Sequence, residues 1–185
     1  AALGNKDPHD IELIWPGLAP PYLDLFAWLE GRAAQPVNCD PAPFRPVMLA
    51  HAIETDDFAT LDAADFIAEW KWDGIRVQAV SGRDAHNNVA RLYSRTGEDI
   101  SAGFPDLLPS LRLAGTIDGE LLVLREGRVQ SFNVLQQRLN RKTVTPKLTK
   151  EYPIHLRAYD LLADGENDLR TLPFAERRAR LEAFI

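Results

Sequence analysis

The chain is organised around the stretch Glu69-Trp70-Lys71-Trp72-Asp73-Gly74-Ile75-Arg76, which contains the pattern Lys-x-Asp-Gly-x-Arg. A lysine acts as a covalent nucleophile only when its amine is neutral, a state favoured by aromatic walls and a nearby cation. Gly74 permits a tight turn or a close approach of the backbone to a ligand. Arg76 is placed to face an anion. The pattern predicts a reactive amine at Lys71, and the rest of the chain decides what that amine does.

Strand patterns flank this motif on both sides. They predict one strand at 66–70 and another at 75–80, joined by a turn that contains Lys71. In the second strand Arg76 alternates with Ile75, so its side chain points to the opposite face, toward a polar cleft. We expect further strands at 89–94, 116–124 and 155–162, with turns at 81–84 and 163–166. Helices are expected at 104–113, after Ser131 and from Thr171 onward. In the helix after Ser131, Arg138 and Arg141 are expected on the outer face. These elements predict an α+β domain built on a mixed sheet.

The first 43 residues differ from the rest, because they are rich in proline and poor in strand patterns. A short helix is expected at 21–30, with Pro21 in its first turn and Gly31 just past its end. We expect 1–43 to be a linker or the tail of a preceding element, and 44–185 to hold the main domain. The helix from Thr171 reaches the last residue without a glycine stop signal, so we expect the domain to be truncated.

Composition narrows the class of protein. The chain has 185 residues, 45% of them hydrophobic, and a net charge of -6, which suits one domain or slightly more. No apolar run approaches the ~20 residues of a membrane helix, and no secretory signal is visible. A single cysteine, Cys39, cannot form an internal disulfide, which favours a reducing compartment and predicts a cytoplasmic protein without membrane contact.

Charge is distributed unevenly along the chain. Residues 1–70 carry 3 basic and 12 acidic side chains, whereas 125–150 carries 7 basic side chains and 1 acidic one. A basic stretch of this kind can bind phosphates even on an acidic protein. The alternative is an ordinary solvated helix face and loop.

Three further residues, together with Arg76, suit a nucleotide site. Glu120 lies in an apolar strand, where an unpaired carboxylate is costly, and it can bind a ribose hydroxyl or Mg²⁺. Arg76 and Arg95 supply planar forks for phosphate or ribose oxygens, and Tyr159 supplies a face for a base. Each has a structural alternative: an ion pair for Glu120 or Arg95, a core position for Tyr159, and a plain surface position for Lys71. Their joint occurrence favours a site.

The order of the short motifs resembles the adenylation domain of ATP-dependent DNA ligases. The motifs are Glu-x-Lys-x-Asp-Gly-x-Arg at 69–76, Ser-Arg-x-Gly-Glu-Asp at 94–99, Asp-Gly-Glu at 118–120 and Tyr-Asp-Leu-Leu at 159–162. The runs at 44–50 and 135–142 resemble the bacterial single-chain ligases in particular. The resemblance covers 44–185, and more weakly 1–43, which is similar to the linker after the N-terminal helical DNA-binding domain of that family.

The resemblance implies a fold and a reaction. The fold is a nucleotidyltransferase, ATP-grasp-like adenylation domain with largely antiparallel sheets and flanking helices. Lys71 would attack ATP and carry AMP covalently, with Mg²⁺ as cofactor. The AMP would pass to the 5′-phosphate at a nick in double-stranded DNA, and the 3′-hydroxyl would then seal the strand. Repair-associated proteins would be further partners, in the bacterial nucleoid.

The resemblance also implies a role for each site residue. Glu69 would meet adenine, Arg76 and Arg95 would contact ribose or phosphate, and Glu120 would hold the ribose hydroxyl or the metal. Tyr159 would stack on adenine, where the family usually has phenylalanine. Contacts with DNA are expected from Arg95, Arg138, Arg141 and Lys142.

The family pattern is incomplete in this chain. A Glu-Gly-hydrophobic motif and a Lys-x-Lys motif, both expected after residue 162, are absent from the sequence. We therefore expect the chain alone to react weakly with ATP or not at all. The alternatives are an RNA ligase or an mRNA-capping-type nucleotidyltransferase, a non-catalytic module that binds DNA or a partner, and an ordinary α+β domain with chance motifs.

Overall fold

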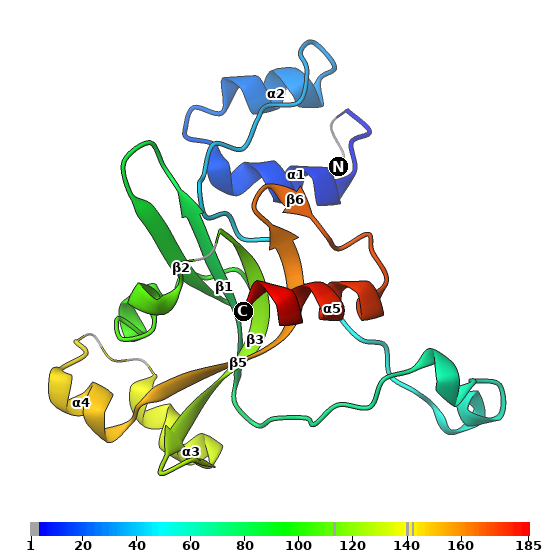
Figure 1. The fold of residues 1–185 in the computed structure, drawn as a ribbon. Coiled ribbons are helices and arrows are strands. Elements are labelled where there is room, and N and C mark those ends of the chain that lie inside the picture. The colour runs from blue at the N-terminus through cyan, green and yellow to red at the C-terminus, as the bar shows by residue number, and fades with distance from the viewer. Residues whose placement is uncertain (1–3, 113, 140, 142) are drawn as a thin grey trace.

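The computed structural model describes residues 4–112, 114–139, 141 and 143–185. One sheet forms its centre, with strand order β2-β1-β3-β5-β6 and β4 paired to the end of β3 (Figure 1). Every strand pairing in the described residues is antiparallel, which confirms the predicted α+β fold with a largely antiparallel sheet. The strands are β1 (Ile75–Arg83), β2 (Asn88–Ser94), β3 (Gly115–Arg125), β4 (Arg128–Val129), β5 (Ile154–Asp164) and β6 (Asn167–Asp168).

In the part of the chain that the structure describes, two α-helices precede the sheet, and three more lie between or after its strands. The α-helices are α1 (Pro8–Ile14), α2 (Leu23–Leu29), α3 (Phe132–Leu135), α4 (Pro146–Glu151) and α5 (Phe174–Phe184). Short 3₁₀ turns are η1 (Trp15–Gly17), η2 (Thr55–Ala59), η3 (Ala63–Asp65), η4 (Ser101–Gly103), η5 (Leu108–Ser110) and η6 (Gln136–Arg138). Among the described residues, none of the helices combines the length and apolarity needed to cross a bilayer.

One core cluster lies on one face of the sheet because of the two-residue period of β1. Val77 and Ala79 pack with Leu92, Leu121 and Phe104 on that face, and burying each large apolar side chain contributes roughly 1.5–3 kcal/mol. Arg76 and Gln78 alternate with them and therefore face the other side. Helix α5 covers part of β5 through a cluster of Leu161, Leu169 and Leu181.

The N-terminal helices have a core of their own. Helix α2, predicted at 21–30, packs its Leu25, Trp28 and Leu29 against Ile14 of α1. The chain then crosses to the sheet, where Asp40 pairs with Arg91, and Ala42 is buried against Val80 and Tyr93. The proposed division of the chain at residue 43 stays a prediction.

Three predicted elements differ from the structure: a strand, a turn and a helix. No strand forms at 66–70, because no neighbouring strand offers hydrogen bonds to this segment. The turn expected at 81–84 lies later, since β1 continues to Arg83, and the Oδ1 of Asp84 then accepts the N–H groups of His86 and Asn87. Residues 104–112 form no α-helix, because Pro105 and Pro109 interrupt the segment and only the 3₁₀ turn η5 forms there. Leu113, the last residue of the predicted helix, lies outside the described residues.

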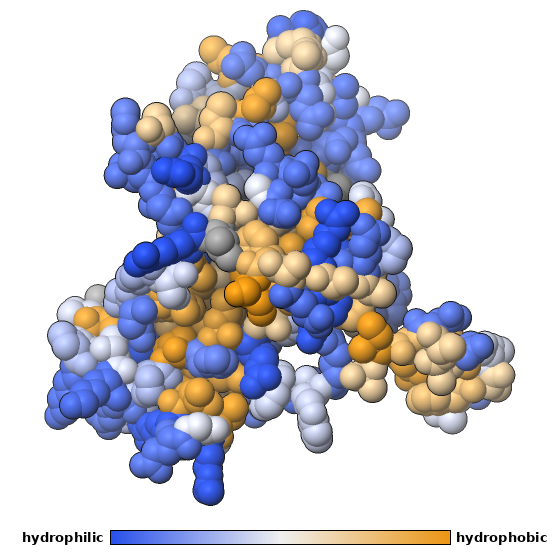
Figure 2. All heavy atoms as spheres, in the orientation of Figure 1, coloured by the Kyte–Doolittle hydropathy of each residue, from blue (hydrophilic) through white to orange (hydrophobic). Residues whose placement is uncertain are grey.

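Residues 46–74 form an arm that leaves the sheet and returns to β1 (Figure 1). Apolar side chains gather on the lobe that holds η2 and η3 (Figure 2). The exposed apolar residues of the arm are Met48, Leu49, Ile53, Phe58, Leu61, Phe66, Ile67 and Trp70. Lys71 lies where this arm rejoins the sheet.

Candidate active site

The sheet register brings residues from four strands into one row at the start of β1. Arg76 pairs with Glu120 of β3, which pairs in turn with Arg157 of β5. On the other side, Val77 pairs with Ser94, so Arg95 leaves the end of β2 beside Arg76. Neighbouring strands lie about 4.8 Å apart, so the row from Arg95 to Arg157 spans about 14 Å. Antiparallel pairing thus gathers Arg76, Arg95 and Glu120, which are far apart in sequence.

Gly74 fixes the approach of the Lys71 segment to this row. A Cβ atom at Gly74 would lie 2.3 Å from the backbone oxygen of Leu121 and 2.8 Å from Cγ of Glu120. Only glycine permits this contact. The backbone N–H of Gly74 lowers the pKa of the Glu120 carboxylate. The glycine of the motif therefore allows the Lys71 segment to pack against β3.

The Glu120 carboxylate is half-buried and faces cations. Burial raises the pKa of Glu120, while the Gly74 N–H and the charges of Lys71 and Arg76 act in the opposite direction. Its oxygens suit a ribose hydroxyl or a Mg²⁺ ion that keeps several waters. Among the described residues, no group of three or more His, Cys, Asp or Glu side chains is placed to hold a metal. The chemistry at Glu120 fits a metal shared with a phosphate substrate.

The two tryptophans beside Lys71 behave differently. Trp70 is 86% exposed, so it does not supply the buried aromatic wall that would favour a neutral lysine. Residues 66–70 have no strand partner, and the Trp70 side chain lies in solvent. Trp72 is partly buried, and the Arg157 guanidinium lies 4.6 Å from the centre of its ring.

Asp118 orders the centre of the site, a role that the sequence analysis missed. Its two carboxylate oxygens accept Nε and Nη2 of Arg76 at 3.1 and 2.6 Å, and Arg76 Nη2 also donates to the Met48 carbonyl at 2.7 Å. Asp118 is 1% exposed. Its only signal in the sequence is its place two residues before Glu120 in the Asp-Gly-Glu motif.

Tyr159 reaches the same centre from a bulge in β5. The register passes from Gly119–Ala158 to Asp118–Asp160 and leaves Tyr159 as the extra residue. Its hydroxyl donates to Asp118 Oδ1 at 3.2 Å, and its ring centre lies 6.0 Å from the Arg76 guanidinium. Burial and the neighbouring carboxylate raise the pKa of Tyr159, which keeps the hydroxyl protonated as a donor.

Glu69 and Arg95 lie at the edge of this arrangement. Glu69 Oε1 accepts Nη1 of Arg178 on α5 at 3.0 Å. Arg95 is exposed in the turn after β2, where Gly97 adopts a φ of +84°. The roles of Glu69 toward adenine and of Arg95 toward phosphate stay predictions.

Arg138 does not lie on the DNA-facing surface that the sequence analysis expected. It is 0% exposed, and its Nη2 and Nη1 contact the Asp106 carboxylate at 2.6 and 3.1 Å. Arg138 lies three residues after the buried Leu135, on the same face of the turn, and its guanidinium also donates to the Tyr152 and Gly103 carbonyls. Arg141 is exposed and stays a candidate, while Lys142 lies outside the described residues.

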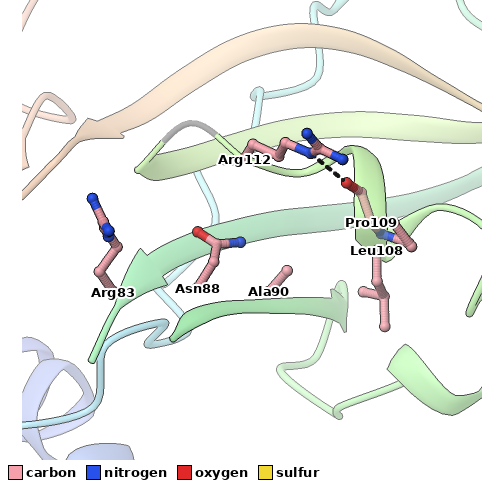
Figure 3. Close-up of a pocket in the computed structure, with 6 residues that line it drawn as sticks. All are labelled: Arg83, Asn88, Ala90, Leu108, Pro109 and Arg112. Atoms are coloured by element: carbon pink, nitrogen blue, oxygen red, sulfur yellow. Dashed lines mark hydrogen bonds between the residues drawn. The ribbon is translucent and has the colours of Figure 1, made fainter. Parts of the chain in front are cut away.

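Two hollows lie elsewhere on the sheet. One, of about 580 Å³, lies at the far end of β1 from Lys71 (Figure 3) and is lined by Arg83, Asn88, Ala90, Leu108, Pro109 and Arg112. The other, of about 750 Å³, reaches Arg157 and Arg178 along β5 and α5. Neither includes Lys71 in its lining.

Comparison with known proteins decides the family of this chain. A sequence profile described as "ATP dependent DNA ligase domain" matches residues 47–185. The chain belongs to this family of ATP-dependent DNA ligase domains. This ligase domain is 37% identical over 147 residues to a probable DNA ligase of Koribacter versatilis, covering 77% of this chain and 25% of that protein. It is 34% identical over 154 residues to DNA ligase 1 of Korarchaeum cryptofilum, covering 79% and 28%.

Among solved structures, the ligase domain resembles that of M. tuberculosis LigD, with 32% identity, a TM-score of 0.47, and coverage of 62% of this chain and 35% of that one. Family membership rests on the sequence matches. The chain spans about a quarter of the length of the curated relatives it matches.

Proposed function

We propose that this ligase domain uses Lys71 to take AMP from ATP and serves a protein that seals nicks in DNA. One observation carries the proposal. Lys71 lies three residues before Gly74, which packs closely against Glu120 in the same cross-strand row as Arg76. A lysine held against a carboxylate and an arginine suits attack on a nucleotide phosphate.

The reaction has three group transfers. The neutral Lys71 amine attacks the α-phosphorus of ATP, forming a nitrogen–phosphorus bond and breaking the bond to the bridging oxygen of pyrophosphate, while the amine proton passes to solvent. The AMP then moves from Lys71 to a 5′-phosphate at the nick, and the freed amine regains a proton. Finally, the 3′-hydroxyl attacks the activated 5′-phosphate, joins the strand and releases AMP. A covalent intermediate divides one difficult transfer into easier ones.

The other side chains orient the nucleotide. Tyr159 offers its ring to adenine, and its hydroxyl bond to Asp118 fixes the ring plane. Glu120 holds a ribose hydroxyl or Mg²⁺; the bound metal would supply positive charge to the phosphates. Asp118 occupies Nε and Nη2 of Arg76, which fixes the guanidinium and directs its Nη1 toward ribose or phosphate.

ATP labelled at the α-phosphate tests this proposal. We expect the full-length natural protein, given Mg²⁺, to acquire an acid-labile label that Lys71→Arg and Lys71→Ala abolish. Lys147→Ala is the control, because Lys147 is exposed on α4. The present chain alone is expected to label weakly. Retained label in Lys71→Ala would disprove the role of Lys71.

The nucleic-acid substrate is tested separately. We expect the full-length protein to seal nicked DNA in preference to nicked RNA, and to require ATP rather than GTP. Sealing of RNA alone would favour an RNA ligase, and attachment of GMP would indicate a capping-type enzyme. DNA binding that is unchanged by Lys71→Ala, with no labelling in any form, would favour a non-catalytic binding module.

A further inference from the structure

The Lys71 segment poses a positioning problem. Residues 66–74 have no regular secondary structure, and Lys71 itself is exposed. A nucleophile that is misplaced by about 1 Å can lose about 100-fold in rate. Contacts outside a strand ladder must therefore hold Lys71 at the row of site residues.

Two arginines contact this segment on either side of Lys71. On the N-terminal side, Arg178 Nη1 donates to Glu69 Oε1 at 3.0 Å and to the backbone oxygen of Tyr159 at 3.1 Å. On the C-terminal side, the Arg157 guanidinium lies 4.6 Å from the ring centre of Trp72. The first contact joins the residue two before Lys71 to strand β5, and the second joins the residue directly after it to the same strand.

Both arginines lie on regular secondary structure that is fixed in the fold. Arg157 belongs to β5 and pairs in register with Glu120. Arg178 is presented by α5, which its neighbour Arg177 anchors: Nε and Nη2 of Arg177 contact the buried Asp160 carboxylate at 2.9 and 2.8 Å. Arg177 therefore fixes α5 on the sheet, and the adjacent Arg178 contacts the Lys71 segment.

We propose that Arg178 and Arg157 are positioning residues that clamp the Lys71 segment against β5, and that the clamp sets the rate at which Lys71 accepts AMP. The inference rests on the proposed function of Lys71. Arg178 holds both Glu69 and the backbone of Tyr159, so it also fixes the distance between the nucleophile segment and the ring assigned to adenine. Neither arginine contacts the reacting atoms in this arrangement.

The first test uses the present chain and needs no activity. Backbone order parameters of 66–74 are measured by NMR relaxation in the unaltered chain and in Arg178→Ala, Arg157→Gln and the double variant. We expect order parameters of about 0.85 in the unaltered chain and below about 0.6 in the variants, because the segment becomes mobile when a contact is lost. Arg180→Ala is the matched control, since Arg180 is on the same helix and pairs with Glu176 at 2.8 Å. Unchanged order parameters at 66–74 in the double variant would overturn the clamp.

The second test measures the rate of AMP transfer to lysine in the full-length natural protein. We expect Arg178→Ala to lower the rate constant about tenfold with a nearly constant KM for ATP, because only the nucleophile position is lost. Arg178→Lys should recover part of the rate, since an ammonium can reach Glu69 without the planar fork. A raised KM with an unchanged rate constant would instead place Arg178 in the ATP site and overturn the proposal.

Lys71→Arg keeps the two hypotheses separate. If this variant retains the label, the proposed role of Lys71 fails. If it loses the label while Arg178→Ala and Arg157→Gln react at the normal rate, the clamp alone fails.

Discussion

Asp118→Ala removes the acceptor that joins Arg76 and Tyr159 at the centre of the site. Asp118 is 1% exposed at its side chain, whereas the Arg76 side chain retains 23% exposure. Breaking a buried ion pair by removing one partner typically costs about 3–5 kcal/mol. Water can reach Arg76 and solvate part of the remaining charge, so we expect a loss of about 2–3 kcal/mol in the free energy of unfolding.

Urea unfolding of the present chain, followed by circular dichroism, measures this loss. With a slope near 2 kcal/mol/M, the midpoint should fall by about 1–1.5 M at an unchanged slope. Tyr159→Phe removes only one hydrogen bond and should cost about 0.5–1.5 kcal/mol. Asp164→Ala, at the exposed end of β5, is the control and should stay within about 0.5 kcal/mol. A loss below about 1 kcal/mol for Asp118→Ala would refute the view that this carboxylate holds the site together.

Three further predictions concern single residues. Gly74→Ala should cost about 1–3 kcal/mol in unfolding free energy and slow AMP transfer, because the new Cβ overlaps the neighbouring strand; Gly103→Ala, which meets nothing within 4 Å, should do neither. Glu120 has a pKa raised above its ordinary value of 4.5, so the folded state binds its proton more tightly and the stability contributed by this group falls as pH rises from 4.5 through the raised value. Glu120→Gln should remove that decline in urea titrations repeated across pH, and an unchanged pH profile would contradict it. Arg138→Ala should cost about 3–5 kcal/mol, as loss of a buried pair does, whereas Arg141→Ala should leave stability within about 0.5 kcal/mol; equal effects would contradict the buried position of Arg138.

Most strands could be predicted from local patterns, and the element that failed shows the limit of such patterns. β1, β2, β3 and β5 match the predicted strands because a two-residue period fixes which side chains face the core. The segment 66–70 has strand-forming residues as well, but a strand needs a neighbour to satisfy its backbone, and none lies beside it. Local propensity does not report the presence of that neighbour.

In the site as well, residue types could be read from the sequence, whereas contacts between distant residues could not. Lys71, Glu120 and Arg76 could be selected from the sequence because their residue types and order carry the chemistry. Asp118 could not be ranked above other acidic residues, since its importance comes from a pairing with Arg76 across 42 positions. Arg138 was assigned to the surface as a charged residue, but it is buried because Asp106, 32 positions earlier, accepts its guanidinium.

The sequence by itself determined the family of the chain and selected Lys71 and Gly74 as candidate site residues, because these depend on residue identity at short spacing. Only the tertiary structure decided how the Lys71 segment is held: by the close approach of Gly74 to Leu121 and by contacts from Arg157 and Arg178. The physical reason is that these contacts join residues more than 40 positions apart, and sheet register and helix docking alone bring such residues together.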